Sequence, residues 1–165
     1  MRKHLYFVCP TDNLENIIDG ESKQENYYCT SLGNSIALDT DTLGQLGLLL
    51  ESKNIEKMSF ILASDNRIVS DALEKQNFLE VEGLRSFYSQ ILRQKNHAEV
   101  SWQTYDYRFL LLSYHLNNKI RELRKGLRNL THLPLTIDGW IYDRRERRFS
   151  EIYFDSVCME SFALN

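Results

Sequence analysis

The stretch KMSFILASDNRIVSDAL, Lys57 to Leu73, predicts a buried strand that runs through a polar elbow into a helix. Met58 to Leu62 is short and continuously apolar, which is typical of a strand covered on both faces. Ser64-Asp65-Asn66 are residue types that begin helices. Apolar residues then follow at helical spacing: Ile68, Val69, Ala72 and Leu73. Ligands of open α/β sheets bind where strands end and helices begin, so we expect a binding site at this elbow.

The elbow carries groups that favour an anion. Ser64, Asp65 and Arg67 would lie where the strand ends. Free backbone N–H groups and the positive end of a helix dipole attract negative charge there, and Arg67 would add to that attraction. The alternative is that Ser64 or Asp65 only caps the helix and Arg67 is a solvated surface charge.

Composition indicates one globular domain that spans residues 1–165. The net charge of −3 gives no general attraction to nucleic acid. No apolar run is long enough to span a membrane, and the basic N-terminus lacks a signal-peptide pattern, so we expect a cytoplasmic protein. The three cysteines, Cys9, Cys29 and Cys158, are an odd number without paired spacing, which disfavours a disulfide framework.

The first half of the chain alternates strands and helices. Lys3 to Cys9 predicts a central strand that Pro10 stops, and a short helix follows that Gly20 is expected to end. Tyr27 to Thr30 is a candidate strand, and Asp39 to Thr42 offers several caps for a helix that reaches about Ser52. This alternation predicts a mostly parallel sheet with right-handed crossovers.

The second half predicts helices and then a hairpin. Apolar residues step by three and four along a helix from about Tyr107 to Leu130. Leu133 to Ile141 predicts a strand with a turn or bulge at Asp138-Gly139, and Phe149 to Phe154 predicts its return strand. The tail from Asp155 to Asn165 is expected to pack on the body or on a second subunit.

Familiar catalytic motifs are missing from the sequence. It contains no Gly-rich phosphate loop, no CxxC and no HExxH, and no nucleophile elbow of the G-x-S-x-G type. His115 lies beside the apolar stripe of the long helix, which is more typical of a satisfied, partly buried histidine than of a metal ligand.

Three stretches in order suggest a family. Ser31 to Ile36 (SLGNSI) precedes a Leu-rich helix and the FILA strand, and Leu135 to Asp143 (LTIDGWIYD) follows the long helix. The first strand ends in Cys9. This order resembles the β-carbonic anhydrases, in which a strand ends in Cys-x-Asp-x-Arg, an Ala-Gly-Asn segment precedes a helix and a strand ending in Gly-His-x-x-Cys, and a His-Gly-Trp-x-Tyr-Asp strand comes late. The resemblance spans nearly the whole chain.

The resemblance implies a three-layer α/β fold with a mostly parallel four-stranded core sheet, helices on both faces, a C-terminal hairpin and usually a dimer. In that family two cysteines and one histidine hold zinc, and an Asp-Arg pair orients the metal-bound water. Here only Cys9 matches a ligand. Ser64 stands at the histidine position and Arg67 at the second cysteine. Thr11 and Asn13 stand at the Asp and Arg positions, with Asp12 one residue out of step.

A second alignment sets Ala63 to Arg67 on the Cys-x-Asp-x-Arg motif, with Asp65 and Arg67 as the pair. The letters fit better, but the Gly-Asn segment then precedes the motif and no His-x-x-Cys follows. In this alignment too the first zinc ligand is missing, because Ala63 replaces it.

The principal hypothesis is a non-catalytic binding or regulatory protein, a homodimer without a metal cofactor. Arg67 would replace the charge of the metal and hold bicarbonate, phosphate or sulfate. An inert pocket in which Arg67 pairs with Asp12 or Asp65 is equally compatible with the sequence. The candidate pocket residues are Cys9, Thr11, Asp12, Gly33, Asn34, Ser64, Asp65 and Arg67.

Two further hypotheses remain open. The chain could be a zinc-dependent carbonic anhydrase or hydrolase whose ligands lie elsewhere, for example at Cys29 or His115, or a metal-free enzyme with Cys9 as the nucleophile. It could also be an interaction module that acts through the long helix or the tail.

Overall fold

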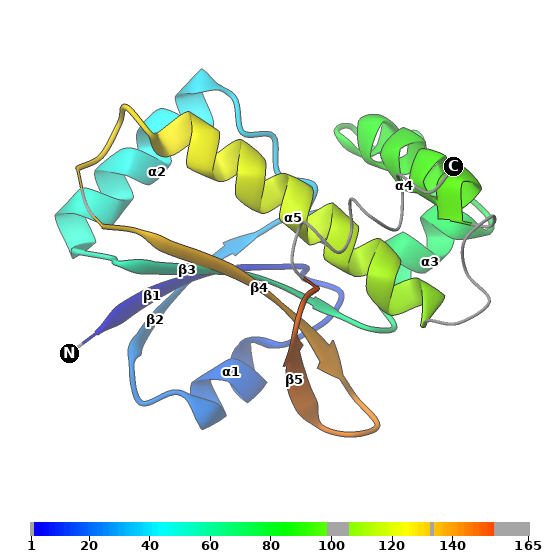
Figure 1. Cartoon of the computed structure of the whole chain (residues 1–165), viewed down its shortest axis with the longest axis horizontal. Coiled ribbons are helices and arrows are strands. Elements are labelled where there is room, and N and C mark those ends of the chain that lie inside the picture. Colours follow the sequence, from blue (N-terminus) through cyan, green and yellow to red (C-terminus); the bar gives the residue numbers. More distant parts are fainter. Residues whose placement is uncertain (1, 99–105, 133, 154–165) are drawn as a thin grey trace.

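A single mixed sheet forms the centre of the molecule in the computed structural model, which describes residues 2–98, 106–132 and 134–153. The described strands lie side by side in the order β2-β1-β3-β4-β5. β2, β1, β3 and β4 run parallel, and β5 returns antiparallel to β4 (Figure 1). The predicted parallel core of four strands and the C-terminal hairpin are therefore confirmed. The strands are β1 (Lys3–Val8), β2 (Glu25–Thr30), β3 (Lys57–Ala63), β4 (Thr136–Asp143) and β5 (Arg148–Glu151).

Helices cover the two faces of the sheet unequally. Of the described helices, α1 alone lies on one face of the sheet, while α2, α3 and α5 lie on the other (Figure 1). α4 lies outside this second layer, where it contacts α3 and α5. None of the described helices has the length and apolarity needed to cross a membrane. The helices are α1 (Glu15–Glu21), the 3-10 turn η1 (Leu32–Asn34), α2 (Thr40–Lys53), α3 (Arg67–Leu73), α4 (Leu84–Ala98) and α5 (Tyr107–Leu127).

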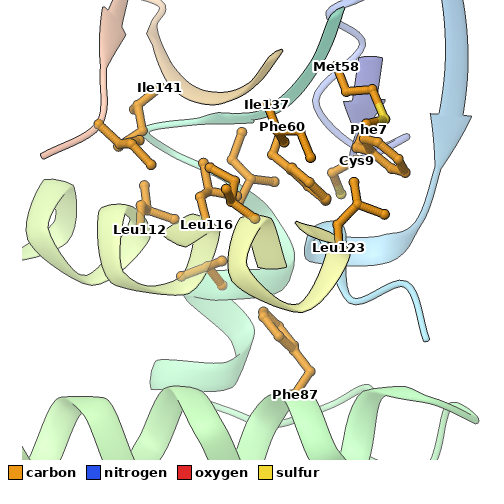
Figure 2. Packing of buried hydrophobic residues seen from close by; sticks show 14 of the residues in the cluster. Phe7, Cys9, Met58, Phe60, Phe87, Leu112, Leu116, Leu123, Ile137 and Ile141 are labelled. Atoms are coloured by element: carbon orange, nitrogen blue, oxygen red, sulfur yellow. The ribbon is translucent and has the colours of Figure 1, made fainter. Parts of the chain in front are cut away.

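The main core lies between the sheet and α5. Phe7 of β1 and Phe60 of β3 are partners in the parallel register, so they lie on the same face of the sheet, and both point toward α5. Their rings stack with centroids 4.3 Å apart. Figure 2 shows them, with Cys9, gathered against Leu116 and Leu123 of α5. This apolar surround fixes the carboxyl end of β1 in the interior.

A smaller cluster covers part of the opposite face. Tyr6 and Val8 of β1 and Ile61 of β3 form its sheet side. They pack against Leu14, which precedes α1, and against Ile18 of α1. The seven residues of α1 are too short to cover the whole sheet, at 1.5 Å of helix per residue. The described helices therefore cover the amino ends of the strands on this face only in part.

Three local predictions are wrong. β4 runs straight through Asp138-Gly139 without a turn or bulge. Gly139 leaves space for Ile152 instead, since a Cβ there would lie 2.6 Å from Cδ1 of that side chain. α1 continues past Gly20 to Glu21, and α5 ends at Leu127. The ambiguous segment 101–105 and the tail 155–165 lie outside the described residues.

Candidate functional site

The thiol of Cys9 is engaged by neighbouring protein groups. Cys9 follows the last residue of β1 and is fully buried. Its Sγ lies 3.1 Å from Oγ1 of Thr11 and accepts the backbone N–H of Gly33 at 3.1 Å. Gly33 has a φ of +62°, and a Cβ on it would lie 2.9 Å from the ring of Phe87. The structure thus brings Cys9, Thr11 and Gly33 together, with little room for another ligand on the sulfur.

Asn34 ties the η1 turn to the two central strands. Its side-chain amide donates to the carbonyl of Phe7 at 3.2 Å and to that of Ile61 at 2.9 Å. Asn34 is fully buried, and its Oδ1 has no hydrogen-bond partner among the described residues. Its φ of +54° is one that asparagine tolerates better than most residues. Gly33 and Asn34 therefore hold η1 against the carboxyl ends of β1 and β3.

Asp12 occupies the space between the ends of β1 and β3. Only 1% of its surface is exposed. Its Oδ2 accepts the backbone N–H of Ala63 at 2.8 Å, and its Oδ1 accepts the amide of Asn66 at 2.9 Å. Burial raises the pKa of Asp12 to about 6, although these two hydrogen bonds and the charge of Arg144 act in the opposite direction. Asp12 thus joins the two strand ends.

The elbow after β3 is held from β4 and from the α3 helix itself. The backbone N–H of Ser64 donates to the carbonyl of Tyr142 at 2.9 Å. Asn66 caps α3 through a hydrogen bond from the backbone N–H of Val69 at 2.9 Å. The predicted helix start is confirmed. Among Ser64, Asp65 and Asn66, the residue that caps the helix is Asn66.

Two arginines from distant parts of the chain complete this structure. Arg144 donates through Nε to Asp65 at 3.1 Å and through Nη2 to the carbonyl of Asp12 at 2.5 Å. Arg108, near the start of α5, donates to the carbonyls of Ser64 and Asn66, the latter at 2.9 Å. Arg108 also donates to Oγ of Ser70 at 2.8 Å. Neither arginine was expected from the sequence, because Arg144 stands in a charged turn that looks like solvated surface and Arg108 is a lone arginine at the start of an apolar helix.

Arg67 lies outside this cluster. It is the first residue of α3 and its side chain is exposed. Within the described ranges its guanidinium makes no hydrogen bond or ion pair, and the partner of Asp65 is Arg144 instead. The alternative in which Arg67 forms an ion pair with Asp12 or Asp65 is therefore wrong. Arg67 presents its charge to solvent, whereas Asp12 and Cys9 are sealed inside.

His115 is a core residue of α5. Its Nε2 lies 2.8 Å from the carbonyl of Gly33, and its ring contacts that of Phe87 edge-on with centroids 5.0 Å apart. Complete burial lowers the pKa of His115 to about 4, so the ring is neutral at pH 7. In the part of the chain that the structure describes, its Nδ1 has no hydrogen-bond partner. His115 thus supports the Gly33 turn from the side of α5.

The residues present do not fit a zinc ion. A catalytic zinc site needs three nitrogen, sulfur or oxygen ligands of suitable type. Among the residues that the structure describes, no three His, Cys, Asp or Glu side chains gather as such a group. Ser64 and Arg67 stand where the resemblance places a histidine and a cysteine, and a guanidinium does not bind a cation. Cys29 lies beside Phe7 in the sheet register and does not supply the missing ligand.

The comparisons with known proteins identify the fold. The sequence matches no protein-family model and no curated protein. Among solved structures, the β-carbonic anhydrase CafD of Aspergillus fumigatus is similar, with a TM-score of 0.72, 19% identity, and 93% of this chain and 90% of that chain covered. A Coccomyxa β-carbonic anhydrase in complex with acetazolamide has a TM-score of 0.66 and 11% identity, with 99% and 85% covered.

The class of protein is therefore a three-layer α/β domain with a parallel 2-1-3-4 core and an antiparallel β5. More particularly, the chain has the β-carbonic anhydrase fold, as its sequence predicted. Two tetrameric β-carbonic anhydrases from Sordaria macrospora also share it, at a TM-score of 0.66 and 15% identity, with 91% of this chain and 80% of that chain covered. Identities this low leave activity to be argued from the site.

Proposed function

We propose that this chain is a β-carbonic-anhydrase-like domain that does not catalyse a zinc-dependent reaction and acts as a binding or regulatory subunit. The observation that carries the proposal is the state of Cys9 and Asp12. Both groups are buried and satisfied by hydrogen bonds from the protein itself. A catalytic zinc would need a free thiolate and an open coordination position.

The test is CO2 hydration measured by stopped flow with a pH indicator, on protein as purified and after addition of zinc. An active β-carbonic anhydrase at the same concentration provides the positive control. We expect no rate above that of the buffer in either preparation. A zinc-dependent rate would support the alternative, an active carbonic anhydrase or related hydrolase with ligands outside the positions considered above.

A metal-free enzyme with Cys9 as its nucleophile is the other catalytic alternative. Reactive cysteines are partly exposed and have lowered pKa values. Cys9 is fully buried. We expect iodoacetamide to modify Cys9 of the folded protein far more slowly than Cys9 of the unfolded chain, as followed by peptide mass spectrometry. Rapid modification of the folded protein at pH 7 would revive this alternative.

Small-anion binding at Arg67 is the second candidate function. The exposed guanidinium has no ion-pair partner in the described parts of the chain, so it is available to bicarbonate, phosphate or sulfate. Chemical-shift titration with phosphate provides the test. Arg67→Ala should weaken binding about tenfold, while Arg93→Ala, which removes an exposed arginine of α4, should not change it. Equal affinities of the two variants would exclude a site at Arg67.

We also propose that the chain forms a homodimer in the cytoplasm, since the similar Sordaria macrospora proteins are described as tetramers. Light scattering coupled to size-exclusion chromatography measures the mass directly. A dimer of this chain has twice the monomer mass of 19.5 kDa. A monomer at micromolar concentration would contradict the proposal.

A further inference from the structure

A cavity of about 270 Å³ lies on the sheet face that α1 covers only in part. It is near the amino ends of the strands, whereas Cys9 and Asp12 lie at the carboxyl ends. The short helix α1 bounds it through Ile18 and Glu21, and Phe149 of β5 contributes from the other side. The lining comprises His4, Tyr6, Ile18, Glu21, Ser22, Gln24, Lys57, Ser59, Ile61, Trp140 and Phe149.

A fixed polar network crosses one side of this cavity. Ser59 of β3 donates to Oδ1 of Asp138 on β4, and its Oγ lies 2.8 Å from Nε2 of His4 on β1. Lys57 pairs with Oδ2 of Asp138 at 3.0 Å. Because the Ser59 hydroxyl donates its hydrogen bond to the carboxylate of Asp138, the Nε2–H of His4 is the donor to Ser59. These contacts hold the polar side chains in place before any ligand arrives.

This network does not have the arrangement of a catalytic triad. In a triad the histidine lies between the serine and the carboxylate and takes the serine proton. Here Ser59 lies in the middle and is fully buried. Its proton is directed to Asp138, so no base is placed to activate it for attack. The network therefore positions side chains for binding.

The charges of this site leave one negative charge unpaired. Lys57 neutralises Asp138. Burial, and secondarily the charge of Lys57, lower the pKa of His4 to about 4, although Asp138 opposes this, so His4 is neutral at pH 7. Glu21 lines the cavity and makes no ion pair with a described residue. The site thus carries a net charge of about −1 at pH 7, which favours a neutral or cationic ligand over an anion.

Apart from Ser22 and Gln24, the remaining lining is apolar and aromatic. Tyr6, Trp140 and Phe149 stand beside Ile18 and Ile61. Aromatic side chains bury much apolar area, and their ring faces attract cations. The volume of 270 Å³ lies just below the usual range of ligand pockets, so a molecule with one ring fits it best. The shape and the charge therefore select the same kind of molecule.

We propose that this cavity is a binding site for a small aromatic amine, with the ring against Trp140 and the ammonium group toward Glu21. This site is separate from the strand ends where the β-carbonic anhydrase resemblance places the metal. It does not depend on whether Cys9 or Arg67 has a function. Its ligand also differs in charge from the anion proposed for Arg67.

A charge series on one ring tests the proposal. Benzylamine, benzyl alcohol and benzoate have nearly the same size and differ in charge. Each is titrated at low salt, and the indole N–H signal of Trp140 is followed by NMR. We expect saturable binding of benzylamine, about fivefold tighter than that of benzoate, with benzyl alcohol between them. Equal affinities, or no saturable shift of the Trp140 signal with benzylamine, would overturn the proposal.

Two variants and one control locate the interaction. Glu21→Gln should reduce the preference for benzylamine over benzoate to about twofold or less. Glu25→Gln removes a carboxylate of β2 that pairs with Lys3 outside the cavity, and it should leave the preference unchanged. Gln24→Trp should fill the rim and abolish benzylamine binding while the melting temperature stays the same. Unchanged binding in Gln24→Trp would also overturn the proposal.

Discussion

The two ends of the central sheet use polar residues in opposite ways. At the carboxyl ends of the strands, Cys9, Asp12 and Asn34 are buried and bonded to other parts of the chain. At the amino ends, Ser59 and His4 also form a network, but it borders an open cavity. At this edge, where α/β sheets usually bind ligands, these buried side chains form a structural joint between the strand ends. An accessible cavity lies at the other end.

The largest expected effect comes from the buried carboxylate of the joint. Asp12→Ala removes the acceptor of Ala63 N–H and of the Asn66 amide, both of which are buried. We expect the free energy of unfolding to fall by about 2–4 kcal/mol, because buried donors without partners cost about 1–3 kcal/mol each. Urea denaturation measures this change.

Asp65→Ala is the matched control for Asp12→Ala. Asp65 is the next carboxylate in this region, but its side chain is exposed and pairs with Arg144 at the surface. Its loss should cost less than about 1 kcal/mol. Similar losses for the two variants would mean that the Asp12 joint is not a stabilising element and would break the comparison between the two sheet ends.

Arg108 of α5, which contacts the start of α3, and Arg67, the first residue of α3, should differ next. Arg108→Ala removes hydrogen bonds to two backbone carbonyls and to Ser70. It should lower the free energy of unfolding by about 1.5–3 kcal/mol, since hydrogen bonds to charged groups are the stronger ones. Arg67→Ala should change it by less than about 0.5 kcal/mol, as expected for an exposed side chain. A large loss in Arg67→Ala would place that residue inside the joint.

The amino-end network should matter less for stability. Ser59→Ala leaves the Nε2–H of His4 without its partner and separates His4 from Asp138. We expect a loss of about 1–2 kcal/mol in the free energy of unfolding, smaller than that of Asp12→Ala, because water in the adjacent cavity can replace one partner. A loss larger than that of Asp12→Ala would reverse the proposed roles of the two ends.

The smallest expected effect is a difference in pH dependence. Because the folded-state pKa of Asp12 is raised to about 6, its contribution to stability is greatest below its unfolded value of 3.8 and is lost as the pH rises through 6. Asp12→Asn has no such titration. The melting temperature of the natural chain relative to Asp12→Asn should therefore rise as the pH falls from 7 to 5. A constant difference would show that Asp12 titrates normally.

His4 and His115 act in the opposite direction. Burial lowers both of their pKa values to about 4, so their contribution to stability is present above their unfolded value of 6.5 and is lost as the pH falls. Both histidines are present in the natural chain and in Asp12→Asn. Their effect therefore cancels in the comparison of the two proteins, although it shapes the absolute melting temperature of each.

The strands and the order of elements could be predicted because their signals are local. The apolar run of Met58 to Leu62 and the polar Ser64-Asp65-Asn66 that follows are enough to place β3 and the start of α3. Periodicity also found α5, with an end three residues too late. The turn predicted at Gly139 was wrong because a glycine is found both in turns and where another side chain packs close to the backbone. Only the tertiary contact with Ile152 distinguishes the two cases.

The site was harder to predict because its partners come from distant parts of the chain. Cys9, Thr11 and Gly33 do meet, as the resemblance implied. Arg108 and Arg144 had no local signal, since Arg144 stands in a charged turn and the partners of Arg108 are about 40 residues away in the chain. Arg67 was expected to face inward, but α3 begins with its side chain in solvent while the Asn66 cap takes the inner position.

The most direct test of the zinc-free joint is the metal content of the untagged protein, measured by elemental analysis beside the Ser64→His/Arg67→Cys double variant. The account predicts far less than one zinc per natural chain. It predicts the same for the double variant, because position 67 faces solvent and the buried thiol of Cys9 is already bonded to Thr11 and Gly33. About one zinc per natural chain, lost in Cys9→Ala, would contradict the account and make the active carbonic anhydrase the better explanation.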